Sequence, residues 1–181
     1  MMRKFVTYFA VVSNLALVDA IVKEWAIARL KGGAWMEVAP FFNLAYVENR
    51  GCAWGMLQNH VWPLAAVGII AIAVVIWKRR RIFDFSTMAV GAKVRSCLAF
   101  WAEALLYAGI FGNLLDRIYR GYVVDMFDFH LGKSHFPCFN VADAYITLAV
   151  VILFAAAFFT KRPRESEQAA IKNASPGTRK S

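Results

Sequence analysis

Cysteine and histidine are scarce in this sequence, and neither residue type forms a recognised motif. The odd number of cysteines and the lack of CxxC or CxxH spacing give no indication of a disulfide framework or a zinc site. They are Cys52, Cys97 and Cys138. The histidines lack the HExxH spacing of zinc proteases. They are His60, His130 and His135. We therefore expect neither a metal ion nor another cofactor.

Signatures of serine and cysteine nucleophiles are also missing. Ser134 is followed directly by His135, but no GxSxG elbow surrounds it. Cys52 with His60, or Cys138 with His135, would pair a thiol with a base, but neither pair has a known local signature. Hydrolysis by a serine or cysteine nucleophile is therefore disfavoured.

Acidic residues are few, 12 against 21 lysines and arginines, which gives a formal net charge of +9. A nucleic-acid-binding protein gathers such cations on one folded face. Here they lie in short segments at the termini and between apolar runs, as the positive-inside rule predicts for a membrane protein. We therefore expect membrane lipids, and not nucleic acid, as partners.

Long hydrophobic runs dominate the chain, which is 60% hydrophobic, compared with roughly 45–50% in ordinary globular domains. Four runs approach the roughly 20 residues that cross a bilayer. They are Phe5–Ala28, Val61–Trp77, Ser96–Gly112 and Asn140–Phe159. The first also resembles a cleavable signal sequence, but Asp19 and Lys23 interrupt its apolar core, so we expect a retained helix. The predicted class is an all-α membrane protein with four transmembrane helices.

Charge between the runs predicts the topology. Basic residues fill the start of the chain and the connection 78–95, which should therefore face the cytoplasm. The connections 29–60 and 113–139 have nearly balanced charge and should face outward; the first is aromatic and should lie on the bilayer surface as a short sheet or half-helix. Residues 1–160 would form one membrane domain with both termini cytoplasmic, and 161–181 a basic disordered cytoplasmic tail.

Polar residues concentrate toward the outer ends of the predicted spans. Ionisable groups are unfavourable there and suggest a functional site, although interhelical hydrogen bonding is the alternative explanation. One shared site near the outer surface would account for them all: Asp19, Asn49, Asn113, Asp116, Arg117, Asp125, Asn140 and Asp143.

Asp125 and Asp143 are the candidate catalytic pair. Asn140 suits the N-cap of the last helix, whose N-terminus favours a charged Asp143 while burial favours the neutral acid. Asp125 lies in a β-prone stretch, 122–129, that would form a short strand or an interfacial turn. Two carboxyls in one site cannot both ionise easily, so the pair would hold the single proton that an aspartyl protease needs. The spacing alone is not specific, and an ordinary first-turn aspartate is the alternative for Asp143.

Five segments together resemble lipoprotein signal peptidase, the bacterial signal peptidase II family. In family order they are Asp19 with Lys23, Asn49-Arg50-Gly51 through Gly55, Gly112–Arg117, Gly121–Asp125 and Phe139–Asp143. The resemblance implies an inner-membrane peptidase that cleaves diacylglyceryl-modified prolipoproteins before the lipid-bearing cysteine. It also implies a small extracytoplasmic β or amphipathic cradle over the substrate, and it places the catalytic pair at Asp125 and Asp143.

By the same resemblance, further residues would bind substrate or orient the pair: Asp19, Lys23, Asn49, Gly51, Asn113, Asp116, Arg117 and Asn140. Asp19 and Lys23 are spaced to form an ion pair on one helix face, and Asp116 is expected to be the structural partner of Arg117. The chain departs from the family's common residues at Ala20, Cys52 and Trp54. These positions lie beside the polar ones, so they affect substrate preference or lipid contacts rather than the reaction.

Two other classes stay open. A non-enzymatic four-span protein would use its buried carboxylates to handle protons or ions, and such residues would then form a path across the bilayer. An enzyme that acts on lipid headgroups would use the same surface location and would need no peptide substrate.

Overall fold

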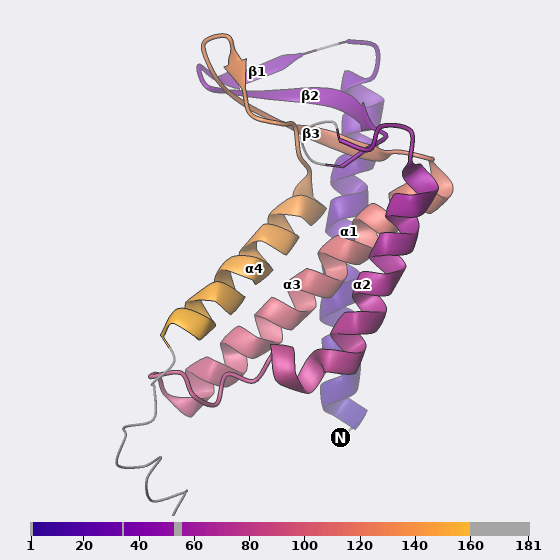
Figure 1. The fold of residues 1–181 in the computed structure, drawn as a ribbon. Coiled ribbons are helices and arrows are strands. Elements are labelled where there is room, and N and C mark those ends of the chain that lie inside the picture. Colours follow the sequence, from indigo (N-terminus) through magenta and orange to yellow (C-terminus); the bar gives the residue numbers. More distant parts are fainter. Residues whose placement is uncertain (1, 34, 53–55, 160–181) are drawn as a thin grey trace, which may run out of the picture.

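The computed structural model describes residues 2–33, 35–52 and 56–159. The predicted tail at 161–181, together with Trp54 and Gly55 of the first outer connection, lies outside the described residues. Within them, four long helices run side by side, and a small sheet covers one end of the bundle (Figure 1). We call this the sheet end; the N-terminus and the connection between the second and third helices lie at the opposite end.

The helices are α1 (Met2–Leu30), α2 (Val61–Ile82), α3 (Ala92–Tyr119) and α4 (Val141–Phe158). All four are long and apolar enough to cross a membrane, which confirms the predicted spans. The second and third were predicted too short, because a helix can continue into charged sequence once its backbone hydrogen bonds are formed. The sequence analysis placed residues 113–117 in the second outer connection, which is wrong. The last turns of α3 carry Asn113, Asp116 and Arg117.

Small side chains face the inside of the bundle and large ones face outward. Ala26, Ala102, Ala108 and Ala149 are fully buried, while the exposed apolar residues are large ones such as Phe154, which is 73% exposed. Helices in lipid gain little from apolar burial, so they associate through close contacts between small residues. The pattern is that of a bundle surrounded by lipid.

Two glycines on α3 allow this helix to approach α4 and α1 closely. A Cβ atom at Gly109 would lie 2.5 Å from the carbonyl oxygen of Ala142 on α4, and one at Gly112 would lie 2.6 Å from Oδ2 of Asp19 on α1. Neither position has room for a methyl group. These two glycines therefore set how closely α3 packs against α4 and α1.

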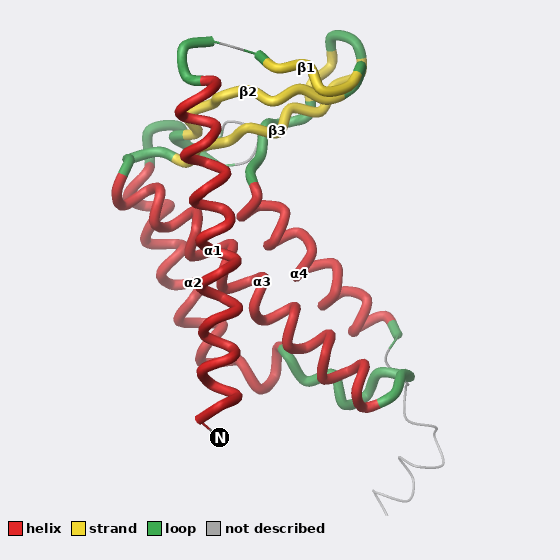
Figure 2. The backbone as a smooth tube through the Cα atoms, turned by 180° about the vertical axis from the view of Figure 1, so that it is seen from behind, coloured by secondary structure: helices red, strands yellow, loops and turns green. Residues whose placement is uncertain are grey.

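The sheet is antiparallel with the strand order β1 (Met36–Ala39), β2 (Phe42–Asn49), β3 (Val123–Leu131) and β4 (Ser134–His135). It confirms the sheet expected in the first outer connection and the strand expected around Asp125. The upper end of α1 reaches this sheet (Figure 2), where Ala26 and Leu30 pack with Val124 and Met126. The strand β3 is thus buried on both faces at Asp125, which is why its hydrophobic alternation in the sequence is incomplete.

Replacing Gly109 by alanine should destabilise the bundle by about 1–3 kcal/mol, because the added methyl group overlaps the backbone of α4. Gly68→Ala on α2 is the matched control: its nearest neighbour would be Cδ1 of Leu114 at 3.7 Å, and alanine is the better helix former. Thermal unfolding in detergent measures both. Equal unfolding temperatures for the two variants would contradict the close packing of α3 and α4.

Candidate functional site

The predicted polar residues meet at the sheet end, where α1, α3 and the start of α4 reach β2 and β3. The structure brings all of them into one connected network of hydrogen bonds and ion pairs: Asp19, Lys23, Asn49, Gly51, Asn113, Asp116, Arg117, Asp125, Asn140 and Asp143. They come from five elements that are far apart in the sequence. No single segment forms the site.

Asp125 lies on β3 with both carboxylate oxygens held by amides. Asn140 donates from Nδ2 to Oδ1 at 2.6 Å, and Asn49, on the neighbouring strand β2, donates from Nδ2 to Oδ2 at 2.9 Å. The residue is only 1% exposed. Its position is fixed by the sheet, in which Asp125 lies opposite Val47.

Asp143 lies in the first turn of α4 and is held by a capping box, which confirms Asn140 as the N-cap. The Asp143 backbone N–H donates to Oδ1 of Asn140 at 3.0 Å, and the Asn140 N–H donates to Oδ2 of Asp143 at 3.3 Å. Asn113 donates from Nδ2 to Oδ1 of Asp143 at 2.7 Å. The free N–H groups of the helix N-terminus favour a negative charge at this position.

Asn140 and Asn113 connect the two carboxylates. Asn140 donates from its side-chain nitrogen to the Asp125 carboxylate and from its backbone N–H to the Asp143 carboxylate, while its side-chain oxygen accepts the backbone N–H of Asp143. Its side-chain nitrogen also lies 3.2 Å from Oδ1 of Asn113, whose own nitrogen bonds Asp143. These neutral amides hold the carboxyls close together without adding charge.

The environment of Asp125 favours its protonated form. Burial raises the pKa of Asp125 to about 7, and the negative charge of Asp143 acts in the same direction. Hydrogen bonds from Asn49 and Asn140 and the charge of Lys23 oppose this rise in the pKa of Asp125 without cancelling it. A raised pKa means that Asp125 holds its proton to higher pH than an ordinary aspartate.

A buried ammonium group supports the pair from α1. Nζ of Lys23 lies 2.8 Å from Oδ2 of Asp19, as predicted, and 3.0 Å from Oδ2 of Asp116. It also donates to Oδ1 of Asn113 at 3.2 Å. An ammonium group can only donate, so this bond fixes which end of the Asn113 amide faces Lys23 and directs the Asn113 nitrogen toward Asp143.

The other contacts of this network join α1 to α4 and correct one prediction. Oδ1 of Asp19 accepts the backbone N–H of Ala142 at 2.8 Å, which satisfies another free donor at the start of α4. Asp116 was expected to pair with Arg117, but its ion pairs are with Lys23 and Arg120. Neighbouring residues on a helix point in different directions, which is why adjacency in the sequence misled.

Arg117 contacts main-chain carbonyls at the site. It donates to the carbonyl oxygen of Asn113 at 3.2 Å and to that of Gly51 at 3.3 Å. Gly51 in turn donates its N–H to Oδ1 of Asn49 at 2.9 Å, which orients the amide that holds Asp125. A Cβ atom at Gly51 would lie 2.5 Å from the Met56 carbonyl oxygen, so only glycine fits here.

A cavity of about 680 Å³ opens beside these groups. Its polar lining consists of Asn49, Asn113, Arg117 and Asp143. Asp125 does not line it and lies behind the amides. The rest of the wall is formed mainly by the segment before α4 and by one face of α4: Phe136, Pro137, Cys138, Phe139, Ala144, Ile146, Thr147 and Leu148. Most of this wall could not be recognised in the sequence, because it exists only once the segment before α4 packs beside the site.

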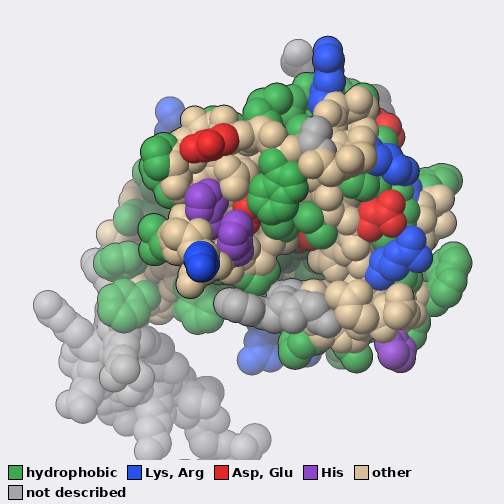
Figure 3. Space-filling view, turned by 90° about the horizontal axis from the view of Figure 1, so that it is seen from above, with side chains coloured by type: hydrophobic (Ala, Val, Ile, Leu, Met, Phe, Trp, Pro, Cys, Tyr) green, Lys and Arg blue, Asp and Glu red, His purple; other side chains and the backbone are tan. Residues whose placement is uncertain are grey.

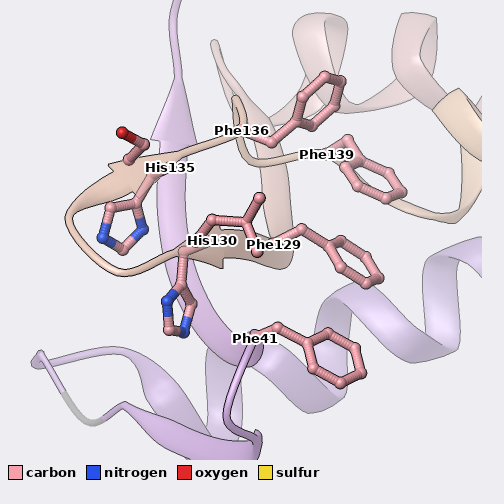
Figure 4. A pocket seen from close by; sticks show the side chains of 8 residues that line it. Phe41, Phe129, His130, His135, Phe136 and Phe139 are labelled. Atoms are coloured by element: carbon pink, nitrogen blue, oxygen red, sulfur yellow. The ribbon is translucent and has the colours of Figure 1, made fainter.

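His135, the base of two of the nucleophile candidates, is engaged by a buried acid and by a second imidazole. Nδ1 of His135 lies 2.8 Å from Oδ1 of the buried Asp128, and its ring stacks on His130 with centroids 5.1 Å apart. Both histidines point away from the phenylalanines of a second cavity of about 630 Å³, which shares Phe136 and Phe139 with the first (Figure 4). Among the described residues, no group of three or more metal-ligating side chains is arranged to hold an ion.

The fold and the site define a multi-pass membrane protein with two amide-linked carboxyl groups at one end of its bundle. A family model described as signal peptidase (SPase) II matches residues 11–159. The chain belongs to the signal peptidase II family, which confirms the resemblance seen in the sequence.

Curated relatives are similar over most of their length. The lipoprotein signal peptidase of Francisella tularensis subsp. novicida (strain U112) is 32% identical over 167 residues, 90% of this chain and 98% of the relative. That of Shewanella sp. (strain MR-4) is 31% identical over 171 residues, 91% of this chain and 94% of the relative.

Two solved structures described as a bacterial membrane enzyme share the fold. One has a TM-score of 0.65 and 26% identity, and the match covers 97% of this chain and 93% of that one. The other has a TM-score of 0.66 and 27% identity, and it covers 83% and 92%.

Lys23→Met should lower stability by about 3–5 kcal/mol, because it leaves the carboxylates of Asp19 and Asp116 buried without their ammonium partner. Lys31→Met is the matched control, since Lys31 is exposed. Chemical unfolding in detergent measures the difference. If the two variants were equally stable, the buried cluster would not contribute to the fold.

Proposed function

We propose that the chain is an aspartyl endopeptidase that removes signal peptides from diacylglyceryl-modified prolipoproteins, with cleavage before the lipid-bearing cysteine. Its family and its similarity to lipoprotein signal peptidases support a protease that processes lipoproteins. The observation that carries the aspartyl mechanism is the amide-linked pair of Asp125 and Asp143, with the pKa of Asp125 raised to about 7.

The two carboxyls would have different roles. Asp143 lines the cavity at a helix N-terminus, so it is the ionised member that takes a proton from the attacking water. Asp125 is the protonated member that polarises the scissile carbonyl. Because Asn49 and Asn140 cover Asp125 here, productive binding requires the Asn49 amide to move off its Oδ2 and let the substrate in.

The remaining polar groups would hold the substrate in an extended form. Arg117 and Asn113 line the cavity beside Asp143 and can donate to peptide carbonyls. Ile146, Thr147 and Leu148 lie on the part of the wall that α4 contributes. A lipid-bearing cysteine would enter from the bilayer along this face, which keeps its acyl chains in an apolar environment.

Topology follows from the charge at the two ends. Side chains of both signs cover the sheet end (Figure 3), whereas six lysines and arginines gather between positions 78 and 95 at the opposite end. By the positive-inside rule the sheet end is the outer face of the bacterial inner membrane. The active site would then lie near the outer surface, with both termini, including the tail 161–181, in the cytoplasm.

Proton or ion transport, the main alternative, is less well supported. Its carboxylates would form a chain across the bilayer. The buried carboxylates of the site lie near the sheet end, and Glu103 of α3 pairs separately with Arg79 near the end of α2. Among the described residues, no hydrogen bond or ion pair joins the Glu103–Arg79 pair to the carboxylates of the site.

Asp125→Asn and Asp143→Asn should each abolish signal-peptide release from a lipidated prolipoprotein, because either change removes an acid or a base from the pair. Asp84→Asn is the matched control on the exposed α2–α3 connection, where the Asp84 carboxylate is hydrogen-bonded to the neighbouring Ser86. Electrophoresis of the purified protein with its substrate measures cleavage, and thermal unfolding checks folding. Cleavage by either folded site variant would remove that residue from the pair.

The rate of cleavage should fall as the pH rises through about 7. A raised carboxyl pKa means that Asp125 keeps its proton below this pH and loses it above, so the rate should drop by roughly tenfold per pH unit on the alkaline side. In Asn49→Ala, which removes a hydrogen bond that lowers the pKa of Asp125, this limb should move to higher pH. Single-turnover rates between about pH 6 and pH 9 test this; a flat profile would contradict the role of Asp125.

A further inference from the structure

A basic surface lies at the end of the bundle opposite the catalytic pair. The end of α2, the start of α3 and the connection between them carry one acidic residue, Asp84, and six basic ones: Lys78, Arg79, Arg80, Arg81, Lys93 and Arg95. In Figure 1 this region lies at the bottom of the molecule, beside the N-terminus. The proposed cleavage reaction uses none of these residues.

Two of these six basic residues, both arginines, serve the fold. Arg79 pairs with the buried carboxylate of Glu103 on α3. Arg95 donates from Nη1 to the carbonyl oxygens of Val90 at 2.7 Å and Met88 at 3.3 Å, so the start of α3 holds the connection. These two residues are therefore already engaged.

The connection itself is anchored. Phe85 and Met88 are 5% and 6% exposed and pack with Ala102 of α3 and Ala156 of α4. The N–H of Ala89 donates to the carbonyl oxygen of Phe159 at 3.2 Å. The basic side chains on either side of the connection thus project from a fixed frame.

The other four basic residues form what we call the inner basic patch: Lys78, Arg80, Arg81 and Lys93. Among the residues that the structure describes, none of the four forms an ion pair with a carboxylate. Arg80, Arg81 and Lys93 are exposed, and Asp84, the nearby acid, accepts the N–H of Ser86. The patch is an unbalanced cationic surface.

The start of α3 adds to this imbalance. Its N-cap, Gly91, has no side chain to accept the free N–H groups, and the first turn contains no acidic residue. Lys93 lies in this positive end of the helix dipole, where an anion is favoured and a cation is not.

Beside the patch the surface becomes apolar. Trp77 is 78% exposed, with Nζ of Lys78 4.4 Å from its ring centroid, and Ile76 and Val74 are also exposed on α2. An exposed tryptophan beside basic residues is typical of the level where headgroups meet acyl chains. A ligand that matches both surfaces has an anionic head and an apolar tail.

We infer that the inner basic patch binds the phosphate headgroup of an anionic phospholipid, with its acyl chains along α2 beside Trp77. Clustered lysines and arginines next to a transmembrane helix attract anionic lipids at this depth. The site is separate from the catalytic pair and does not rest on the proposed protease activity. Free phosphate would satisfy the charge but not the apolar surface.

The test uses the full chain in a neutral detergent, with phosphatidylglycerol, phosphatidylcholine or inorganic phosphate added. The patch variant is Arg80→Gln, Arg81→Gln and Lys93→Gln combined, which leaves Arg79 and Arg95 in place. The control variant, Arg29→Gln, Lys31→Gln and Lys133→Gln, removes the same charge from exposed residues at or near the sheet end. Thermal unfolding and the lipid retained in native mass spectrometry are the readouts.

We expect phosphatidylglycerol, and neither other addition, to raise the unfolding temperature of the wild type and the control variant. The patch variant should lose this shift and the retained lipid, and salt should reduce the shift in the wild type. The proposal is overturned if the patch variant keeps the shift or if the control loses it equally. An equal shift with phosphatidylcholine or inorganic phosphate would also overturn it.

Discussion

The site depends on holding the Asp143 carboxyl, on the cavity wall, near the buried carboxyl of Asp125. Like charges repel strongly beside a buried group, so only one of the two is readily ionised. Asn140 donates from its side chain to the Asp125 carboxylate and from its backbone N–H to that of Asp143, and the Asn113 side chain also donates to the Asp143 carboxylate. Neutral amides add no charge here, whereas a cation in direct contact would lower the pKa of Asp125.

The positive charge of Lys23 is separated from the pair by the side chain of Asn113. Lys23 touches neither carboxyl of the pair; it lies between Asp19 and Asp116 and bonds the amide oxygen of Asn113. Gly112 has no side chain to separate Asp19 from α3, so α1 comes close enough to reach the start of α4 through the Asp19 carboxylate. The positions of the polar groups in the site therefore depend on the close packing of small residues in the bundle.

Much of this arrangement could be predicted from local pattern. The cap of Asn140 on α4, the pairing of Asp19 with Lys23 and the strand that carries Asp125 each depend on residues a few positions apart. The errors had the same origin. Arg117, the next residue in the sequence, was predicted to pair with Asp116, which instead pairs with Lys23. The third helix was predicted to end with its apolar run at Gly112, but α3 continues to Tyr119.

By itself, the sequence determined the four spans, the cap of the last helix, the residues available for chemistry and their family. Periodicity, capping and hydropathy are local, so they can be recognised without knowing the fold. Only the tertiary structure decided that Asp143 faces the cavity while Asp125 lies behind it, that Asn113 bridges Lys23 and Asp143, and that Glu103 belongs to Arg79. Those contacts join helices and strands far apart in the chain, and their geometry is set by how closely the elements pack.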